Sequence, residues 1–399
     1  MRLAAIPEKK YQNYRREVIF GAYKWDPQVG DRGTVSRHAL LMDAGTADQL
    51  ERWAEALAGE TVRMEAALAR NPVMMERLGI PKAIRRAYAH LANGDAGRHV
   101  RLMRFDFHPT DEGWAVSEVN SDVPGGLAEG SVLPEIAERF FPDATPRRHV
   151  GRVLLDAFRA RSRPGGTVAF VHATSYSDDL QTMRFLGDIF EAEGYTAVYA
   201  APDHIRWSGG RATVSFGDGE AALDGLLRFF PLEWMVDLPR SADWHGFFGA
   251  TTPSCNHPAA FLSQSKRLPL VWDELGVDVP VWKRLLPPTC DPAELRELPE
   301  GWIWKPALGR VGEDITIPGA MAEKELRAVV KNVKRRPGDW VAQWMFHSRP
   351  LAVPDGSEYH CCVGVFTVDG RAAGFYARAS PSPRIDGGAE DVPVLVHGS

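Results

Sequence analysis

Residues 104–120 constrain the fold more than any other stretch, because they are typical of a β-hairpin with a polar face. Their sequence is RFDFHPTDEGWAVSEVN. Residues 102–107 and 114–119 alternate between apolar and polar types, and the turn-forming sequence TDEG lies between them. The segment therefore predicts two antiparallel strands that pair around residues 110–113.

The polar residues of this hairpin predict a magnesium site. Side chains two residues apart lie on the same face of a strand, so Arg104 and Asp106 share one face. Glu118 and Asn120 share a face of the second strand in the same way. Two carboxylates and an amide suit Mg²⁺, which takes its other ligands from water and substrate phosphates. The alternative is an exposed hairpin with a polar face and no ligand.

Composition places the chain among ordinary globular proteins. Its 399 residues are enough for two to three lobes around a large core. The 52 acidic and 47 basic residues give a net charge of −5 and are spread along the chain. This balance argues against a nucleic-acid groove or a membrane surface. No apolar run reaches the length of a transmembrane helix. We therefore expect neither nucleic acid nor a membrane as a partner.

The cysteines predict a reducing environment. They show no metal-ligand spacing, and the adjacent pair Cys361 and Cys362 argues against an ordinary disulfide. The other two, Cys255 and Cys290, are isolated in the sequence. The N-terminal residues lack the apolar core of a signal peptide. The expected location is the cytoplasm.

Periodicity divides the chain into three regions. Apolar residues at helical spacing predict helices over residues 47–77 and 80–92. In the middle, residues 167–172 and 196–200 are typical of buried strands, and residues 178–193 of a helix between them. The GxGxxG fingerprint and the Walker A loop are both missing. We expect regions at residues 1–145, with the helices and the hairpin; 146–255, with the α/β unit; and 256–399.

The last region carries a candidate phosphate-binding loop. Residues 302–304 read as a strand, and Lys305 follows at its end. A lysine supplies a point charge, Arg310 a planar fork, and Gly309 and Gly312 allow backbone amides to approach phosphates closely. The alternative is a surface loop.

Two further positions follow from local patterns in this region. Residues 359–369 and 372–379 predict a second hairpin around the turn Asp369-Gly370, and Arg378 projects from its second strand. Residues 256–267 predict a helix that carries Lys266. A lysine in such a place is usually exposed to solvent.

Six motifs resemble one family in both content and order. They are the R-x-D of RFDF with the E-x-N-x-D of EVNSD, then LDGLLRFFPLEWM, SQSK, WKPALGRVGEDI, AAGFYARAS and DVPVLV. Together they resemble the synthetase portion of glutathionylspermidine synthases and their shorter relatives, which are ATP-grasp ligases. The similarity spans almost the whole chain, from roughly Trp25 to Val394.

The resemblance implies a fold and a set of roles. The expected fold is mixed α/β, an ATP-grasp fold with a preATP-grasp-like βαβ domain, and residues 256–399 would form the nucleotide-binding lobe. Arg104 would meet the substrate carboxylate or the transferring phosphoryl group, and Arg378 would stabilise charge on the reacting centre. Lys266 and Lys305 would bind the nucleotide from two sides of its cleft. The implied Mg²⁺ ligands are Asp106, Glu118 and Asn120, and the other implied ATP contacts are Gly309, Arg310, Gly312 and Gln343.

The implied reaction is ATP- and Mg²⁺-dependent amide formation between a peptide-like or amino-acid carboxylate and an amine, with polyamines among the candidates. ATP would convert the carboxylate to an acylphosphate, which the amine then attacks; the loop at residues 308–313 would close over it. Val123 and the Pro124-Gly125-Gly126 sequence depart from the family pattern and leave the use of glutathione open. The alternatives are a non-catalytic nucleotide-binding protein with this fold and a metal hydrolase.

Overall fold

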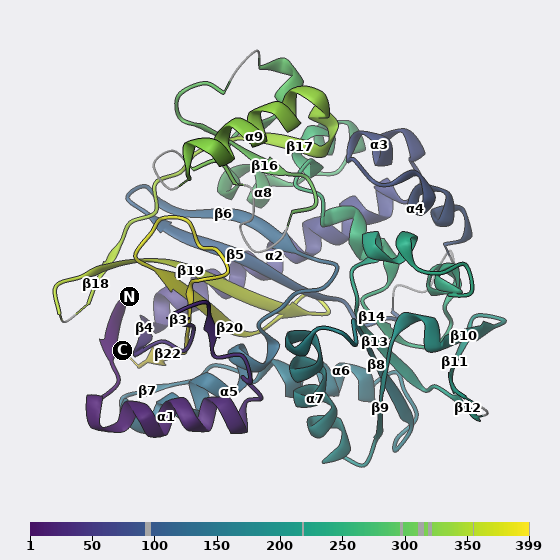
Figure 1. Cartoon of the computed structure of the whole chain (residues 1–399), viewed down its shortest axis with the longest axis horizontal. Coiled ribbons are helices and arrows are strands. Elements are labelled where there is room, and N and C mark those ends of the chain that lie inside the picture. The colour runs from purple at the N-terminus through teal and green to yellow at the C-terminus, as the bar shows by residue number, and fades with distance from the viewer. Residues whose placement is uncertain are drawn as a thin grey trace.

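The centre of the molecule is an antiparallel sheet that joins the first predicted hairpin to the C-terminal part of the chain (Figure 1). Its register pairs Asp106 with both Glu118 and Gly364, and Arg378 with Cys362. The sheet order is β21 (Glu390–Val392), β20 (Arg371–Ser380), β19 (Glu358–Val368), β5 (Leu102–Thr110) and β6 (Gly113–Asn120), with β18 (Leu351–Ala352) paired to β19.

The computed structural model describes residues 1–91, 97–217, 219–295, 298–309, 315–317, 321–353 and 355–398. Within these ranges the other sheets flank the central one. Two are mixed or antiparallel: β1 (Arg2–Ala5), β4 (His38–Asp43), β22 (Val394–His397) and β7 (Ala144–Thr145); and β15 (Thr289–Cys290), β17 (Trp340–Trp344) and β16 (Trp302–Pro306). The third, β14 (Ser254–Cys255), β13 (Gly225–Phe229), β8 (Thr167–His172) and β9 (Thr196–Ala200), is parallel. Two small ones are β10 (Ile205–Ser208), β11 (Arg211–Phe216) and β12 (Gly219–Ala222), and β2 (Gln28–Val29) with β3 (Arg32–Gly33).

Both predicted hairpins are confirmed. The first strand of the first hairpin is three residues longer than the predicted range 102–107, because β5 continues to Thr110. In the second, Asp369 and Gly370 have φ angles of 50° and 78°. Two consecutive positive φ angles define the turn that matches the twist of paired strands, which explains the Asp-Gly sequence.

Helices cover the sheets and contain the predicted apolar stripes. The helix expected over residues 47–77 is two helices, because the chain leaves helical geometry between Leu68 and Pro72. Asp43 caps the first of them by accepting a hydrogen bond from the backbone N–H of Thr46 at 2.8 Å. The helices are α1 (Glu8–Gly21), α2 (Ala44–Leu68), α3 (Pro72–Arg77), α4 (Lys82–Ala87), α5 (Leu127–Ala137), α6 (Val150–Arg159), α7 (Ser177–Glu191), α8 (Pro280–Leu285) and α9 (Glu323–Arg335).

The α/β unit of the middle region is confirmed. Strands β8 and β9 have the predicted bounds and pair in parallel, and α7 lies between them in sequence. Figure 1 shows this unit to the lower right of the central sheet. The small lobe of β16, β17 and α9 lies above the central sheet in the same view. The N- and C-termini lie on the same side of the molecule, because β1 and β22 both pair with β4.

The predicted helix over residues 256–267 is wrong. Only a short 3₁₀ helix forms, over Pro258–Ser263. The chain then turns away, because the backbone N–H of Lys266 donates to the carbonyl of Ala307 at 2.9 Å rather than to a helical partner. The side chain of Ser265 likewise donates to the carbonyl of Leu78 at 2.6 Å. Contacts with other segments therefore replace helical hydrogen bonds here.

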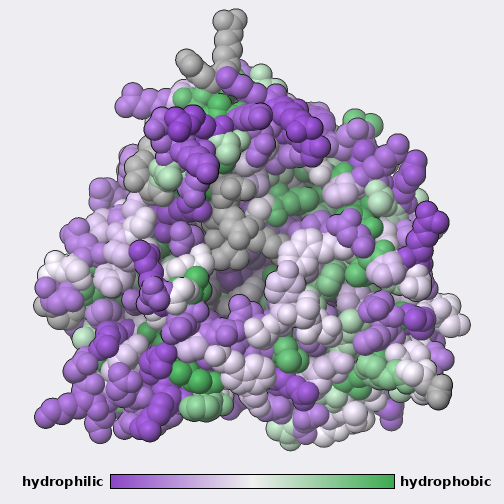
Figure 2. All heavy atoms as spheres, in the orientation of Figure 1, coloured by the Kyte–Doolittle hydropathy of each residue, from purple (hydrophilic) through white to green (hydrophobic). Residues whose placement is uncertain are grey.

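Among the described residues, every helix is too short or too polar to cross a bilayer. Figure 2 shows hydrophilic residues over most of the coloured part of one face, with apolar residues in small separate groups.

Candidate active site

One face of the central sheet forms the floor of a cavity of about 960 Å³. Six of the predicted site residues line it: Arg104, Asp106, Glu118, Asn120, Lys305 and Arg378. The first four come from the β5–β6 hairpin, whereas Lys305 lies one residue before the end of β16 and Arg378 lies on β20. Residues more than 180 positions apart in sequence therefore meet, as shown by a 3.5 Å contact between Lys305 Nζ and the Ser117 carbonyl.

A β-bulge at Ser117 shifts the register of the hairpin by one residue and so pairs Asp106 with Glu118. Asp106 pairs with Glu118 but Phe107 pairs with Val116, so Ser117 has no partner on β5. Bulges of this kind re-aim side chains near functional sites. The sequence carries a signal for it, because the two polar residues Ser117 and Glu118 interrupt the alternation between Val116 and Val119.

The two candidate metal carboxylates converge on one amide. Asn120 Nδ2 lies 3.0 Å from Asp106 Oδ2 and 3.4 Å from Glu118 Oε1. Arg104 binds Asp106 with both arms, Nε to Oδ1 at 2.7 Å and Nη2 to Oδ2 at 2.9 Å. Arg104 lies across Gly364, where a β-carbon would come within 2.7 Å of its Cδ. In this structure Arg104 therefore neutralises Asp106.

Lysines surround the second carboxylate. Lys266 Nζ lies 3.0 Å from Glu118 Oε2 and donates to the Gly309 carbonyl at 2.6 Å. Lys305 Nζ donates to Gln343 Oε1 at 2.7 Å. Burial raises the pKa of Glu118, but Lys266, Lys305 and Arg104 outweigh burial and lower that pKa to about 2. Glu118 is therefore ionised at neutral pH.

Burial has the opposite consequence for the lysine on β16. Desolvation lowers the pKa of Lys305 to about 8, although the Glu118 carboxylate opposes this change and Lys266 adds to it. Lys305 as a whole residue is only 4% exposed to solvent. A group held near its titration point gains its full charge when an anion such as a phosphate arrives.

Arg378 is oriented by backbone carbonyls. Its Nη2 donates to the carbonyls of Asp386 at 2.7 Å and Ala389 at 3.2 Å. Its Nε lies 3.8 Å from Asp391 on the neighbouring strand, and Tyr376 donates to the same carboxylate at 2.8 Å. These contacts fix one nitrogen of the guanidinium, and Arg378 lines the cavity.

Sequence reasoning missed several residues that line the cavity. Sequence reasoning assigned no site residue to the segment at residues 23–33, yet Lys24 and Asp26 line the cavity. Lys24 pairs with Glu129 at 2.8 Å and Asp391 at 2.9 Å. No local pattern marked these residues, because their neighbours in space come from distant segments. The other lining residues include His108, Asp178, Asp179, Tyr376 and Arg384.

The remaining predicted ATP residues divide into two groups. Lys266 and Gln343 lie one layer behind the cavity and line a space of about 30 Å³ next to Glu118. Among the described residues, Lys266 lines only this small space and not the large cavity, so its contact with a nucleotide stays a prediction. Gly309 contributes its carbonyl to Lys266. Arg310, Gly312 and most of the expected closing loop at residues 308–313 lie outside the described residues.

The side of the cavity next to the small lobe is apolar. It is lined by Ile303 on β16, by Ile315 and Ile317, and by Met345 and Phe346 just after β17. An apolar slot beside Lys305 suits a flat heteroaromatic ring joined to phosphates. The implied contact of Gln343, on β17, with ATP stays a prediction.

The donor chemistry fits a magnesium ion. Asp106 and Glu118 provide carboxylate oxygens beside the Asn120 Nδ2, and the amide oxygen of the same side chain would complete a mixed oxygen set of the kind that suits Mg²⁺. Within the described ranges, no group of three or more His, Cys, Asp or Glu side chains is placed to hold a metal. The candidate set therefore depends on the amide as its third member.

Comparisons with known proteins give the family. The family model for the glutathionylspermidine synthase preATP-grasp matches residues 7–397. A glutathione synthetase-like effector from Globodera pallida has 9% identity, covers 98% of each chain and superimposes with a TM-score of 0.66. A proposed γ-glutamylcysteine synthetase from Methylobacillus flagellatus has 13% identity, coverage of 84% of this chain and 88% of its own, and a TM-score of 0.42. No curated protein matches the sequence.

The family match extends over nearly the whole chain, and the fold agrees with it. The predicted mixed α/β architecture with an ATP-grasp fold is confirmed by the sheets described above and by the match to the first of these structures. The chain belongs to the glutathionylspermidine synthase preATP-grasp family.

Proposed function

We propose that this protein is an ATP-dependent ligase that joins a peptide-like or amino-acid carboxylate to an amine. One observation carries the proposal: two carboxylates, a buried lysine and two arginines from segments far apart in sequence line the same cavity. Phosphoryl transfer requires positioning and neutralisation of phosphate oxygens more than covalent chemistry, and these residue types supply both.

The reaction follows from the weakness of a carboxylate as an acyl donor, because its leaving group would be oxide. The carboxylate oxygen attacks the γ-phosphorus of ATP, ADP leaves, and an acylphosphate results. The amine nitrogen then attacks the acyl carbon, and inorganic phosphate leaves as the amide forms. Lys305 neutralises the ATP phosphates, and Arg378 stabilises the negative charge on the phosphoryl group and on the tetrahedral centre.

Asp106, Glu118 and Asn120 would hold Mg²⁺, which would supply positive charge to neutralise phosphate oxygens. For this to occur, Arg104 has to release Asp106, to which it is bound in this structure. The freed guanidinium can then bind a substrate carboxylate or the transferring phosphoryl group with two parallel hydrogen bonds.

The charge at the other end of the cavity favours a cationic amine. Asp26 from the N-terminal segment and Asp178 and Asp179 from the first turn of α7 line this end. Side-chain carboxylates raise the local concentration of cations in a cleft. This supports an amine substrate, with polyamines among the candidates.

A cytoplasmic location is supported by the four free cysteines.

The test is ADP release by the purified protein with ATP and Mg²⁺ across a panel of carboxylic acids and amines. Release should depend on both an acid and an amine, and mass spectrometry of the product made from a metabolite extract should identify the amide. ATP binding without turnover across the panel would instead favour the non-catalytic nucleotide-binding alternative. Activity with metal and without ATP would favour a hydrolase.

A further inference from the structure

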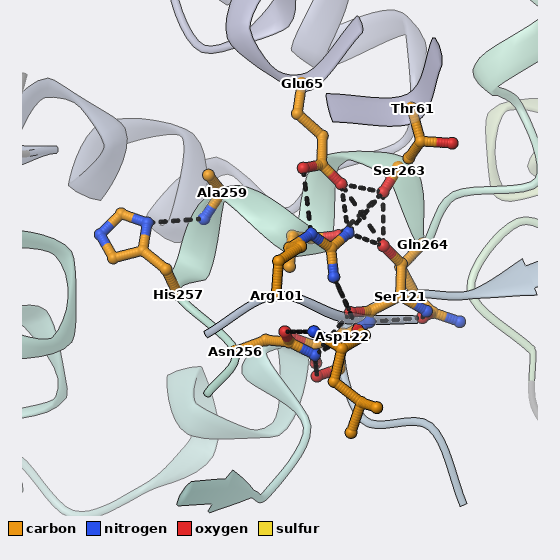
Figure 3. A network of polar contacts seen from close by, with 12 residues as sticks. Thr61, Glu65, Arg101, Ser121, Asp122, Asn256, His257, Ala259, Ser263 and Gln264 are labelled. Atoms are coloured by element: carbon orange, nitrogen blue, oxygen red, sulfur yellow. Dashed lines mark hydrogen bonds and ion pairs between the residues drawn. The ribbon is translucent and has the colours of Figure 1, made fainter. Parts of the chain in front are cut away.

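The chain immediately after the hairpin is held by one buried glutamine. The backbone N–H groups of Ser121 and Asp122 both donate to Gln264 Oε1, at 2.8 and 2.9 Å (Figure 3). Gln264 is only 4% exposed. A carbonyl oxygen has two lone pairs, so this one side chain satisfies two adjacent backbone donors directly after Asn120.

Other side chains fix the carbonyls of the same two residues. Asn256 Nδ2 donates to the Ser121 carbonyl at 3.0 Å and to the Asp122 carbonyl at 3.2 Å. Arg101 Nη1 also donates to the Ser121 carbonyl, at 2.9 Å. Figure 3 shows these groups converging, with Glu65 beside Arg101. The peptide groups that follow the last candidate metal ligand therefore have side-chain partners for both donors and acceptors.

The segment that carries Gln264 also contacts the nucleotide side. Two residues further on, Lys266 binds Glu118 through its side chain and the Gly309 carbonyl through the same amine. Its backbone N–H donates to Ala307, just after β16. The four-residue segment from Ser263 to Lys266 thus contacts the end of the hairpin and also the residues that follow β16.

We propose that Gln264 is a positioning residue that sets the placement of Asn120 and Glu118 relative to Lys266. The inference rests on the proposed function and deepens it, because the family motif that supplies Lys266 then has a second role. Gln264 itself lines the small space behind Glu118, and among the described residues it is not part of the large cavity. It therefore acts through the residues it holds.

The test measures the affinity of the full-length protein for AMP-PNP by calorimetry, with Mg²⁺ and with EDTA. Gln264→Met keeps the length and shape of the side chain but accepts no comparable hydrogen bond. We expect it to weaken binding with Mg²⁺ roughly tenfold or more, in the range found for residues that orient metal ligands, and to weaken binding in EDTA less. Gln264→Glu retains an oxygen that can accept from both N–H groups but adds a buried charge, so with Mg²⁺ it should lose less affinity than Gln264→Met.

Thr252→Val is the matched control. Thr252 Oγ1 accepts a hydrogen bond of 2.8 Å from the buried backbone N–H of Ala212, and Thr252 does not line the cavity. This variant should lower the melting temperature and leave both affinities unchanged. If Gln264→Met does not fold, Gln264→Asn withdraws the oxygen by one methylene and should give the same selective loss. Wild-type affinity with Mg²⁺ in the tested variant, or an equal loss in the control, overturns only this inference. If the wild-type protein itself does not bind AMP-PNP with Mg²⁺, the proposed function fails and this inference with it.

Discussion

At the scale of single residues, the site is a set of opposite charges that hold one another before any substrate arrives. Arg104 occupies Asp106, and Lys266 occupies Glu118. The depressed pKa of Glu118 means that its ionised form stabilises the fold at pH values above its ordinary range near 4.5, and that this contribution is lost as the pH falls toward 2. Under the proposed function, a bound substrate would replace these internal partners.

Glu118→Gln is the cleanest test of the metal assignment. The change keeps the shape and removes the charge, so Mg²⁺-dependent ADP formation should fall by more than about 100-fold. Glu112→Gln, in the exposed turn of the same hairpin, should have no effect. Asp106 is less suitable, because its removal leaves Arg104 buried without its partner, a defect that costs about 3–5 kcal/mol. Wild-type ADP formation in Glu118→Gln would contradict the assignment.

Lys305 should make nucleotide binding depend on pH. Its pKa of about 8 lies well below the ordinary 10.5, so the free protein loses this charge as the pH rises through 8. Bound phosphates favour the charged form, so above this pH binding takes up a proton and affinity falls by up to about tenfold per pH unit. Calorimetry in buffers of different ionisation enthalpy measures the uptake.

Lys305→Arg is the comparison, because arginine stays charged over this range. Its affinity for the nucleotide should be flat between pH 7.5 and about 9.5. The same pH dependence in both proteins would show that another group is responsible.

At the scale of secondary-structure elements, α2 is the longest helix among those described, with 25 residues. It packs against β19 and β20 (Figure 1), and none of its residues lines the cavity. Its start is specified by Asp43, whose second oxygen accepts from the Thr46 hydroxyl at 2.8 Å. The helix thus supports the floor of the site without contributing to its chemistry.

Asp43→Ala should therefore lower stability without changing nucleotide affinity. Loss of an N-cap acceptor costs about 1 kcal/mol, because the N–H of Thr46 loses its partner. Asp43→Asn retains an acceptor and should recover most of the loss. Differential scanning calorimetry measures the melting temperature, and an AMP-PNP titration measures affinity; a large change in affinity would show that α2 acts on the site.

At the scale of the whole molecule, the cavity exists because three parts of the chain surround it. The floor is the central sheet, the apolar side comes from the β16–β17 lobe, and the acidic end comes from the N-terminal segment with α7. A nucleotide in the cavity would contact the first two of these parts at once, which makes its binding a test of the arrangement.

Hydrogen exchange provides that test. With Mg²⁺ and AMP-PNP, exchange should slow together in β5, β6, β16 and the segment after β17, because ligand binding suppresses opening of the elements it joins. The distant hairpin of β10 and β11 should be unchanged. Protection limited to β16 and β17 would contradict a site shared between the small lobe and the central sheet.

Local sequence was enough for features that depend on near neighbours. The alternation of residues 102–107 gave β5, the Asp-Gly turn gave the second hairpin, and β8 and β9 have the predicted bounds. It failed at residues 256–267, where the hydrogen bonds of Ser265 and Lys266 to other segments replaced a helix. It also missed the bulge at Ser117, whose signal was two adjacent polar residues.

What the sequence determined by itself, then, is which side chains share a face of each strand and which motifs occur in which order, because both depend on residues close together in the chain. Only the tertiary structure decided that β5 pairs with β19, which brings Asp106 and Arg378 to one surface. It also placed Lys24 in the cavity wall, Lys266 behind Glu118 and Arg104 on Asp106. These contacts follow from how buried faces of distant elements pack together, and no local periodicity encodes that choice.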